Sequence, residues 1–287
     1  MSWQAMLLFG VAVAILLGLF VYWLIWISEG AYLGSWAVRW LYDWGARTYD
    51  DVKQYVPADE AVFLGNPLFS RLEEDFGPHS LLLDVATGTG RLPLALFAIP
   101  FYEGEIVALD ISREMLAEAA RKCVPYRDRI AFLHHPAVPL PFEDETFDAV
   151  TSMEALEFMP DRHATLREMV RVLRPGGWFV ISNRIGLDAQ LMPGRTDSRE
   201  ALELFLGTLG LVDIFTRPWQ VDYDLVFARK AGSAGEGRGL AGTWLMALRC
   251  PHCGSCGEGR VTPDEWYCAA CDYVIDIGED GVWELGG

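Results

Sequence analysis

The chain has 287 residues, which is enough for one medium domain and a small second one. Its hydrophobic fraction of 52% is high for a purely soluble protein. The formal net charge of −17 argues against nucleic acid as a partner, because phosphates would be repelled, and against adhesion of the whole surface to anionic lipid.

Residues 1–28 are predicted to be a transmembrane anchor. The run from Ala5 to Ile27 contains no charged residue and is long enough to cross a hydrocarbon core of about 30 Å as a helix. Tyr22, Trp23 and Trp26 are expected at one membrane interface. A cleaved signal peptide is the alternative, but no Lys or Arg precedes the run, which is also too long for the apolar region of a signal peptide.

Basic residues after the span predict its orientation. Arg39, Arg47 and Lys53 all follow it, and the positive-inside rule places such residues in the cytoplasm. The sequence therefore predicts a single-pass membrane protein whose remaining chain lies on the cytoplasmic side.

Residues 29–78 are predicted to be a membrane-proximal helical segment, which prolines and glycines break into short helices and turns. Two interpretations fit its aromatic residues, namely a helix on the membrane surface or packing on the following domain. These residues are Trp36, Trp40, Tyr42 and Trp44.

The next segment has the pattern of a ligand-binding turn in a parallel sheet. The apolar run Leu81–Val85 predicts a strand that is buried on both faces. Gly88 and Gly90 follow it, and glycine allows a tight turn and close approach of the backbone to a ligand. A second run, Ile106–Leu109, ends in Asp110, an acid placed to hold a ribose diol. Several nucleotide-binding folds share this geometry.

Strand and helix patterns then alternate, which predicts parallel strands joined by right-handed crossovers. Ser112 and Asp161 are expected to cap two of the helices. A helix near Ser198–Leu209 precedes two further strand-like runs. The remaining predicted strands are Ile130–Leu133, Asp148–Ser152, Trp178–Ser182, Leu211–Arg217 and Val221–Ala228.

The glycine turn, Asp84-x-Ala86-x-Gly88-x-Gly90, resembles motif I of the class I, seven-stranded S-adenosylmethionine-dependent methyltransferases, with Ala86 where their first glycine usually stands. Later segments resemble the family's later motifs in the same order. They are Asp110–Leu116, Leu140–Phe142, Phe147–Val150 and Arg171–Gly177. The resemblance covers about residues 49–230 and is closest to the branch that includes quinone-biosynthesis methyltransferases.

The resemblance implies an α/β domain at residues 79–230. Its sheet is expected to be doubly wound, mostly parallel, seven-stranded and Rossmann-like, and the last two strands are expected to form an antiparallel hairpin. The cofactor implied is S-adenosylmethionine, held at the glycine turn with Asp110 accepting from the ribose hydroxyls.

Two further features bear on the cofactor site. Tyr49 belongs to a segment that resembles the part of the family folding over the cofactor. Pro136 stands where many relatives carry an acid near the adenine amino group, so backbone atoms or His135 must replace that acid, unless His135 is a surface residue. Ile111 and Met115 either flank the adenine or belong to the core. The predicted cofactor-binding residues are thus Asp84, Ala86, Thr87, Gly88, Gly90, Asp110, Ile111, Met115, His135 and Tyr49.

Methyl transfer from a sulfonium is an in-line displacement, in which alignment of the nucleophile supplies most of the catalysis. An enol or phenol acceptor can require a base, and an amine must lose a proton. Glu154 and Glu157 follow the fourth predicted strand and are the candidate bases, with solvated surface charge as the alternative. Glu157 and Phe158 stand where relatives often have histidines, so the family's substrate does not transfer directly.

The last part of the chain is predicted to be a linker at residues 231–247, flexible by composition, and a zinc-ribbon-like module at residues 248–287. Its two C-x-x-C pairs fit a closed tetrahedral zinc site of structural type. Cys256 can replace Cys253 in that set, and a disulfide framework is the alternative in an oxidising compartment. The predicted zinc ligands are Cys250, Cys253, Cys268 and Cys271, with His252 as a weaker competitor.

These features together predict a membrane-anchored S-adenosylmethionine-dependent methyltransferase. The anchor indicates a small, lipophilic acceptor such as a quinone precursor or polar lipid. Two alternatives remain, namely a catalytically inactive cofactor-binding scaffold that holds a protein partner through its zinc ribbon, and a protein methyltransferase. Acidic residues around the cysteines argue against nucleic-acid binding by the ribbon.

Overall fold

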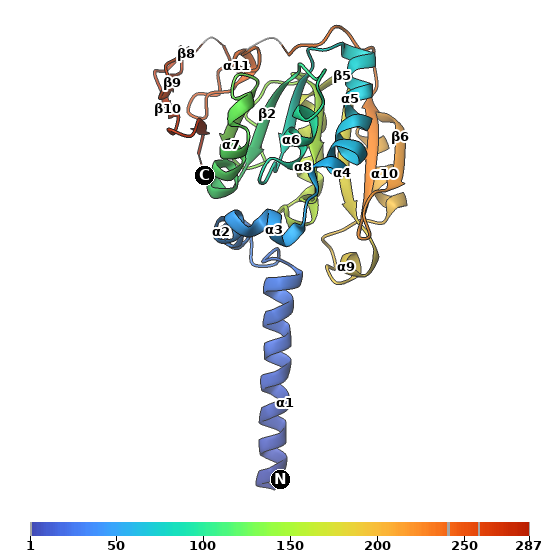
Figure 1. Ribbon diagram of the computed structural model, residues 1–287. Helices are drawn as coiled ribbons and strands as arrows, with labels where there is room; N and C mark the ends of the chain where they lie inside the picture. Colours follow the sequence, from blue (N-terminus) through green and yellow to red (C-terminus); the bar gives the residue numbers. More distant parts are fainter. Residues whose placement is uncertain (1, 240–241, 258, 287) are drawn as a thin grey trace.

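The computed structural model describes residues 2–239, 242–257 and 259–286. At its centre lies a sheet whose strand order across those residues is β11-β3-β2-β1-β4-β5-β7-β6 (Figure 1). Neighbouring strands from β11 to β5 run parallel, and β7 runs antiparallel to β5 and β6. The strands are β1 Leu81–Val85, β2 Glu105–Asp110, β3 Ile130–His134, β4 Phe147–Ser152, β5 Leu173–Arg184, β6 Leu211–Pro218, β7 Tyr223–Lys230 and β11 Val282–Glu284.

The strands β1 to β7 form the predicted Rossmann-like sheet, with the predicted antiparallel hairpin at β6 and β7. One boundary differs, because β5 begins at Leu173, before the Pro-Gly-Gly segment that was expected to precede the strand. The register between β4 and β5 shifts there, and Gly176 has a positive φ of 75°. The glycines therefore accommodate a bulge within β5. Strand order reverses between β1 and β4, the place where such sheets bind ligands.

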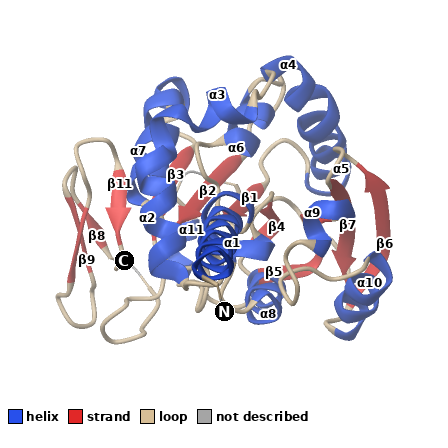
Figure 2. Ribbon diagram, turned by 90° about the horizontal axis from the view of Figure 1, so that it is seen from below, coloured by secondary structure: helices blue, strands red, loops and turns tan. Residues whose placement is uncertain are grey.

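Helices cover both faces of the sheet (Figure 2). α5, α6 and α7 pack on one face, and α8 and α10 pack on the other. Ser112 and Asp161 cap α7 and α8 as predicted, accepting from the amides of Met115 (3.2 Å) and Ala164 (2.9 Å). The helices are α5 Asn66–Phe76, α6 Arg91–Phe97, α7 Arg113–Lys122, α8 Arg162–Val172, α9 Gly186–Gln190 and α10 Arg199–Thr208.

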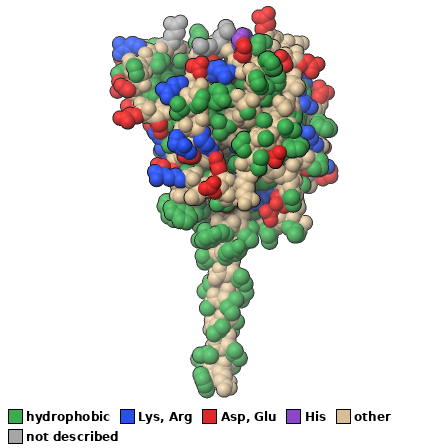
Figure 3. Space-filling view, viewed as in Figure 1, with side chains coloured by type: hydrophobic (Ala, Val, Ile, Leu, Met, Phe, Trp, Pro, Cys, Tyr) green, Lys and Arg blue, Asp and Glu red, His purple; other side chains and the backbone are tan. Residues whose placement is uncertain are grey.

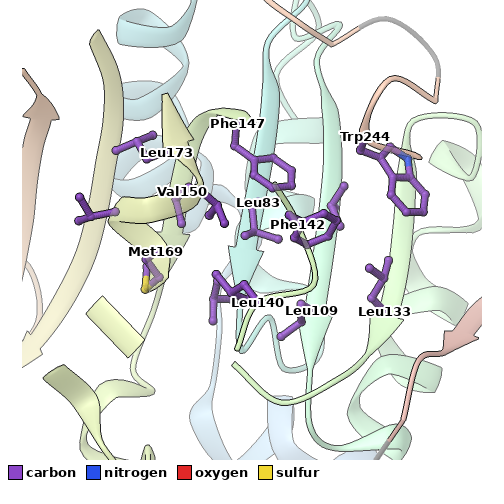
Figure 4. Close-up of a cluster of buried hydrophobic side chains, with 14 of the residues drawn as sticks. Leu83, Leu109, Leu133, Leu140, Phe142, Phe147, Val150, Met169, Leu173 and Trp244 are labelled. Atoms are coloured by element: carbon purple, nitrogen blue, oxygen red, sulfur yellow. The ribbon is translucent and has the colours of Figure 1, made fainter. Parts of the chain in front are cut away.

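Burial on both faces explains the apolar runs of the central strands. Every residue of β1, β2 and β4 is buried, as expected for parallel strands between two layers of helices. Figure 4 shows part of one core cluster, in which Leu83 and Leu109 from β1 and β2 lie near Phe142 and Phe147. The two phenylalanine rings meet edge to face with centroids 4.9 Å apart, a favoured aromatic geometry.

The N-terminal helix projects away from this domain (Figure 1). α1 (Trp3–Tyr22) continues into a π-helical turn, η1 (Trp23–Ile27), and together they form a 25-residue apolar helix. Neither element has a buried residue. By length and composition this helix is able to cross a membrane.

The segment after η1 folds back under the domain as α2 (Ser35–Gly45), α3 (Tyr49–Lys53) and α4 (Pro57–Glu60), with short turns between them. Its aromatic residues divide between two environments. Tyr42 packs inward against Phe158, with ring centroids 5.9 Å apart. Trp36, Trp40 and Trp44 recur every four residues on one face of α2, where they are 64%, 62% and 77% exposed.

Composition predicts a flexible linker at residues 231–247, but the structure shows a docked segment. The amides of Gly237 and Gly239 donate to the carbonyls of Phe76 (3.0 Å) and His79 (2.8 Å). A Cβ on Gly237 would lie 2.3 Å from the His79 carbonyl oxygen. Glycine at this position allows the two backbone segments to approach closely, and it does not indicate flexibility. Residues 240–241 of the predicted linker lie outside the described residues, and α11 (Trp244–Ala247) ends it.

The C-terminal module contains a small antiparallel sheet of β8 (Arg260–Val261), β9 (Glu265–Tyr267) and β10 (Val274–Asp276). It was predicted to form a unit of its own through residue 287. Its last strand, β11, instead pairs with β3 and extends the main sheet. β3 would otherwise be the edge of the sheet, and Val282 and Trp283 bury apolar surface by covering that edge.

Candidate functional site

The turn after β1 presents backbone atoms to a cavity at the carboxyl ends of the strands. Ala86, Gly88 and Gly90 all have positive φ, at 57°, 55° and 83°. Open space faces Gly88, since a Cβ built there would have no neighbour within 4 Å. Behind the turn, the buried Asp84 carboxylate accepts from the hydroxyls of Thr87 and Thr151, both at 2.7 Å. Burial raises the pKa of Asp84 to about 7.

Asp110, at the end of β2, lies beside this turn. Its carboxylate accepts from the backbone amides of Gly88 and Ser112, each at 2.8 Å. Burial raises the pKa of Asp110, and the two amide hydrogen bonds oppose that shift. Each carboxylate oxygen can accept more than one hydrogen bond. The carboxylate therefore keeps capacity to accept from a ligand.

A cavity of about 420 Å³ connects these groups, within the size range of small-molecule sites. Six of the predicted residues contribute to its lining, namely Tyr49, Ala86, Gly88, Asp110, Ile111 and Glu154. Apolar groups from α2 and from the loop after β4 also line it, among them Val38, Tyr42, Met153, Ala155, Phe158 and Met159.

The N-terminal segment closes one side of this cavity. Asp43 in α2 accepts from the Ser112 hydroxyl at 2.6 Å. Asp50 in α3 accepts from the Thr89 hydroxyl and from Lys122 Nζ, both at 2.5 Å. The segment that carries the membrane-proximal helices is thereby attached to the glycine turn and to α7. The sequence predicted a position near the cofactor for Tyr49, but no sequence pattern indicated the contacts of Asp43 and Asp50.

Glu154 lines the cavity from the loop after β4. It has a positive φ of 51° and is buried. Its carboxylate forms ion pairs with Arg91 and with Lys53, the latter at 3.3 Å. Arg91 also binds Glu60 through two contacts of 2.7 Å. Arg91, Lys53 and Glu60 escaped sequence reasoning because they come from three separate elements that meet only in the folded chain.

Glu157 takes a different position from Glu154. It lies in a single 3-10 turn, η5 (Leu156–Phe158), is 2% exposed, and does not contribute to the cavity lining. The hydroxyl of Tyr223 donates to its carboxylate, and Arg184 Nη1 lies 3.4 Å away. Burial raises the pKa of Glu157. The structure therefore separates the two predicted bases, with Glu154 at the cavity and Glu157 beneath its wall.

The remaining predicted cofactor residues lie around the cavity rather than on its surface. Met115 is fully buried within α7, as in the core interpretation. His135 Nδ1 lies 2.7 Å from the Pro136 carbonyl, and its ring borders a neighbouring depression with Arg171 and Arg249. Pro136 itself lines the cavity, so the departure from the family's acid falls on the cavity wall.

A second site lies in the C-terminal module. The sulfurs of Cys250, Cys253, Cys268 and Cys271 all lie within 4.8 Å of one another, as predicted from the two C-x-x-C pairs. Two of the separations are 3.7 Å, between Cys250 and Cys271 and between Cys253 and Cys268. Cys256 lies outside this cluster, with its sulfur 3.8 Å from the Ala247 carbonyl.

Comparison with known proteins agrees with the geometry of the cavity. Residues 83–181 match the family model described as a methyltransferase domain. The chain is 37% identical over 145 residues to a demethylmenaquinone methyltransferase of Symbiobacterium thermophilum, covering 50% of this chain and 57% of that protein. It is 44% identical over 98 residues to the protein of that name in Bacillus licheniformis, covering 34% and 42% respectively. The chain thus spans about half the length of these curated relatives.

A solved S-adenosylmethionine-dependent methyltransferase of Aquifex aeolicus has a similar fold, with a TM-score of 0.50 at 20% sequence identity. The match covers 62% of this chain and 96% of that one. The fold and the family match place residues 83–181 in the class of methyltransferase domains. Within that class, the curated relatives reported above carry the name demethylmenaquinone methyltransferase.

Proposed function

We propose that this protein transfers a methyl group from S-adenosylmethionine to a small, lipophilic acceptor of the quinone-precursor class. One observation carries the proposal. A single cavity is lined both by the glycine turn with Asp110 and by apolar groups, including Phe158 and Met159. The polar groups suit the adenosine part of the cofactor, and the apolar groups suit an apolar ring. The names of the sequence relatives support the same acceptor class.

The residues present fit S-adenosylmethionine. Asp110 is placed to accept from the ribose hydroxyls, and Gly88 allows the cofactor to approach the backbone closely. Ile111 and the backbone near Pro136 would border the adenine. Glu154 would place negative charge near the cationic methionine part of the cofactor.

When bound, the cofactor supplies an activated methyl group, and the chain has to align the acceptor with it. The apolar wall excludes water and orients an acceptor ring. Glu154 is the cavity-lining candidate for holding a proton of the acceptor, although Arg91 and Lys53 already share its lone pairs. Under this proposal Glu157 acts from beneath the wall, through the packing of Phe158, rather than on the acceptor.

The proposal includes a single-pass membrane anchor with the methyltransferase domain in the cytoplasm. The helix Trp3–Ile27 is apolar and has no buried residue. Hydrophobic side chains continue from it onto the adjoining end of the domain (Figure 3). The exposed face of Trp36, Trp40 and Trp44 lies at that end, as amphipathic helices do at a membrane interface. A lipid-soluble acceptor would then reach the cavity from the bilayer.

We also propose that the four-cysteine cluster holds a structural zinc ion. A Zn–S distance of about 2.3 Å puts tetrahedral ligands about 3.8 Å apart. The observed separations of 3.7 Å match that edge length. All four ligands come from the chain, so no coordination position remains for a substrate.

The proposed function is tested with full-length protein in lipid nanodiscs, methyl-labelled S-adenosylmethionine and a demethylated menaquinone. We expect label in the organic extract, and less of it with Asp110→Asn when S-adenosylmethionine is below saturation. Absence of labelled lipid from protein that binds S-adenosylhomocysteine would refute the acceptor class. Label in a protein band would instead support the protein methyltransferase alternative.

A further inference from the structure

The C-terminal end of the chain lies against the strand that borders the cofactor cavity. β11 pairs in parallel with β3, with Trp283 opposite Leu133 and Glu284 opposite His134. β3 pairs in turn with β2, which places His134 opposite Asp110. A strand from the cysteine module is therefore one strand removed from the residue proposed to hold the ribose.

Glu284 makes two charged contacts at this edge. Its carboxylate accepts from Arg113 Nε at 2.5 Å and lies 2.7 Å from His134 Nδ1. The other ring nitrogen of His134 lies 3.1 Å from the carbonyl oxygen of Ile111. Both partners of the ring are oxygen atoms, so His134 joins Glu284 to the backbone carbonyl of Ile111.

These contacts support the cavity wall from behind. Asp110, Ile111 and Ser112 line the cavity, and Arg113 is the next residue in the chain. Glu284 reaches this segment twice, at Arg113 directly and at Ile111 through His134. Arg113 is also bound by Asp280 through two contacts of 2.9 Å. Two carboxylates near the end of the chain thus bind the residue next to the cavity lining, and Glu284 also reaches Ile111 through His134.

The position of β11 depends on the module that carries the cysteines. Cys271 is followed by β10, which pairs with β9 next to Cys268. Ile277 then forms an isolated β-bridge with Trp283, and Trp283 packs on Trp244 with ring centroids 5.1 Å apart. Three short strands bury little apolar surface, and modules of this size need a metal or a disulfide to stay folded.

We propose that the metal-loaded cysteine module is a built-in positioning element for the cofactor cavity, and that Glu284 is its positioning residue. The dependence on metal rests on the zinc site proposed above, whereas the role of Glu284 rests on its own contacts. Loss of metal loosens β10 and β11, Glu284 leaves His134 and Arg113, and the segment Asp110–Ser112 loses its support.

The first test measures binding of S-adenosylhomocysteine to zinc-loaded, full-length protein in detergent by calorimetry. Glu284→Gln should raise the dissociation constant about tenfold, because a carboxylate that contacts both Arg113 and His134 is lost. Zinc content and melting temperature should stay at the wild-type values. Glu279→Gln is the matched control, because Glu279 is exposed and has no hydrogen bond or ion pair within the described part of the chain. An unchanged dissociation constant for Glu284→Gln would overturn the positioning role.

The second test removes the metal with a chelator and restores it with Zn²⁺. We expect weaker S-adenosylhomocysteine binding in the metal-free protein, recovery on zinc addition, and a smaller response in Glu284→Gln, in which Asp280 still binds Arg113. Equal affinity with and without metal would overturn the coupling. A protein that holds no zinc at all would refute the zinc proposal. The comparison of Glu284→Gln with the wild type would still test the positioning role, because it does not require metal removal. Neither test depends on methyl transfer. If the proposed acceptor is wrong, both tests can therefore still be interpreted.

Discussion

The backbone amide of Gly88 donates a hydrogen bond of 2.8 Å to the carboxylate of Asp110. This contact joins the turn after β1 to the end of β2, and it places a buried carboxylate beside the open space that faces Gly88. A second amide, from Ser112, approaches the same carboxylate from the other side. The position of the acceptor for a ribose diol is therefore set by backbone atoms on two elements.

Replacing Asp110 with Asn should weaken binding of S-adenosylhomocysteine at least about tenfold. The asparagine side chain has one oxygen acceptor, whereas the backbone amides of Gly88 and Ser112 donate to the two different oxygens of Asp110. The NH₂ group of asparagine must therefore face one of these two N–H groups, and two hydrogen-bond donors then repel each other. The dissociation constant from calorimetry checks this. Asp128→Asn, at an exposed aspartate far along the next connection, should leave it unchanged. Equal affinity for both variants would show that Asp110 does not hold the cofactor.

The central strands and the glycine turn were predictable because each depends on a short stretch of sequence. The apolar runs of β1 and β2 are continuous because both faces are covered, and Gly88 and Asp110 directly follow those runs. The ion pairs of Glu154 were not predictable. Arg91 and Lys53 reach it across 63 and 101 residues of sequence, and no local pattern records that contact.

The C-terminal strand illustrates the same limit. The two C-x-x-C pairs predicted the sulfur cluster, since four ligands at that spacing have a local signature. Val282 to Glu284 is too short to be recognised as a strand, and its partner β3 lies 150 residues earlier at His134. The glycine-rich composition also led to a wrong prediction of flexibility at Gly237. The absence of a side chain there allows the backbone to pack closely against His79.

Asp84 should make the stability of the domain depend on pH. Burial raises its pKa to about 7, well above the ordinary value of 3.8. The native state therefore binds more protons at Asp84 than the unfolded state does between these two pH values. The contribution of Asp84 to the free energy of unfolding is thus greatest below about pH 4 and falls as pH rises to about 7. The slope in that window is at most roughly 1.4 kcal/mol per pH unit.

Comparison with Asp84→Asn isolates this effect, because the amide does not ionise. Urea denaturation at pH 4.5, 6.0 and 7.5 should show the wild type losing stability relative to Asp84→Asn as pH rises. The constant part of the difference reflects the hydrogen bonds to Thr87 and Thr151, and only the part that varies with pH tests the prediction. A difference that is independent of pH would contradict the raised pKa.

Ala86 occupies a backbone conformation that favours glycine, with φ at 57°. A residue with a Cβ pays roughly 1–2 kcal/mol in the left-handed region. Ala86→Gly should therefore stabilise the domain by about 1 kcal/mol, after the extra flexibility of glycine in the unfolded chain is subtracted. Ala201→Gly, at an exposed position within α10, should destabilise it by a similar amount. Urea denaturation checks both, and equal signs for the two substitutions would exclude strain at Ala86.

Glu154→Gln and Glu157→Gln make the same chemical change three residues apart and should have different consequences. At the cavity, Glu154→Gln removes the carboxylate that lines the space proposed for the cationic part of the cofactor, and it leaves the charge of Lys53 without that partner and Arg91 paired with Glu60. Like charges then repel, so affinity for S-adenosylmethionine, with its sulfonium, should fall more than affinity for the uncharged thioether of S-adenosylhomocysteine.

Glu157→Gln should act on stability instead. The amide must serve both the Tyr223 hydroxyl and Arg184 in a fully enclosed place, and a poorly satisfied buried group costs about 1–3 kcal/mol. Urea denaturation and calorimetry with both ligands measure the two effects separately. If Glu157→Gln lowered turnover strongly without a loss of stability, Glu157 would have to reach the acceptor. The loop after β4 would then differ in the bound state from the arrangement seen here.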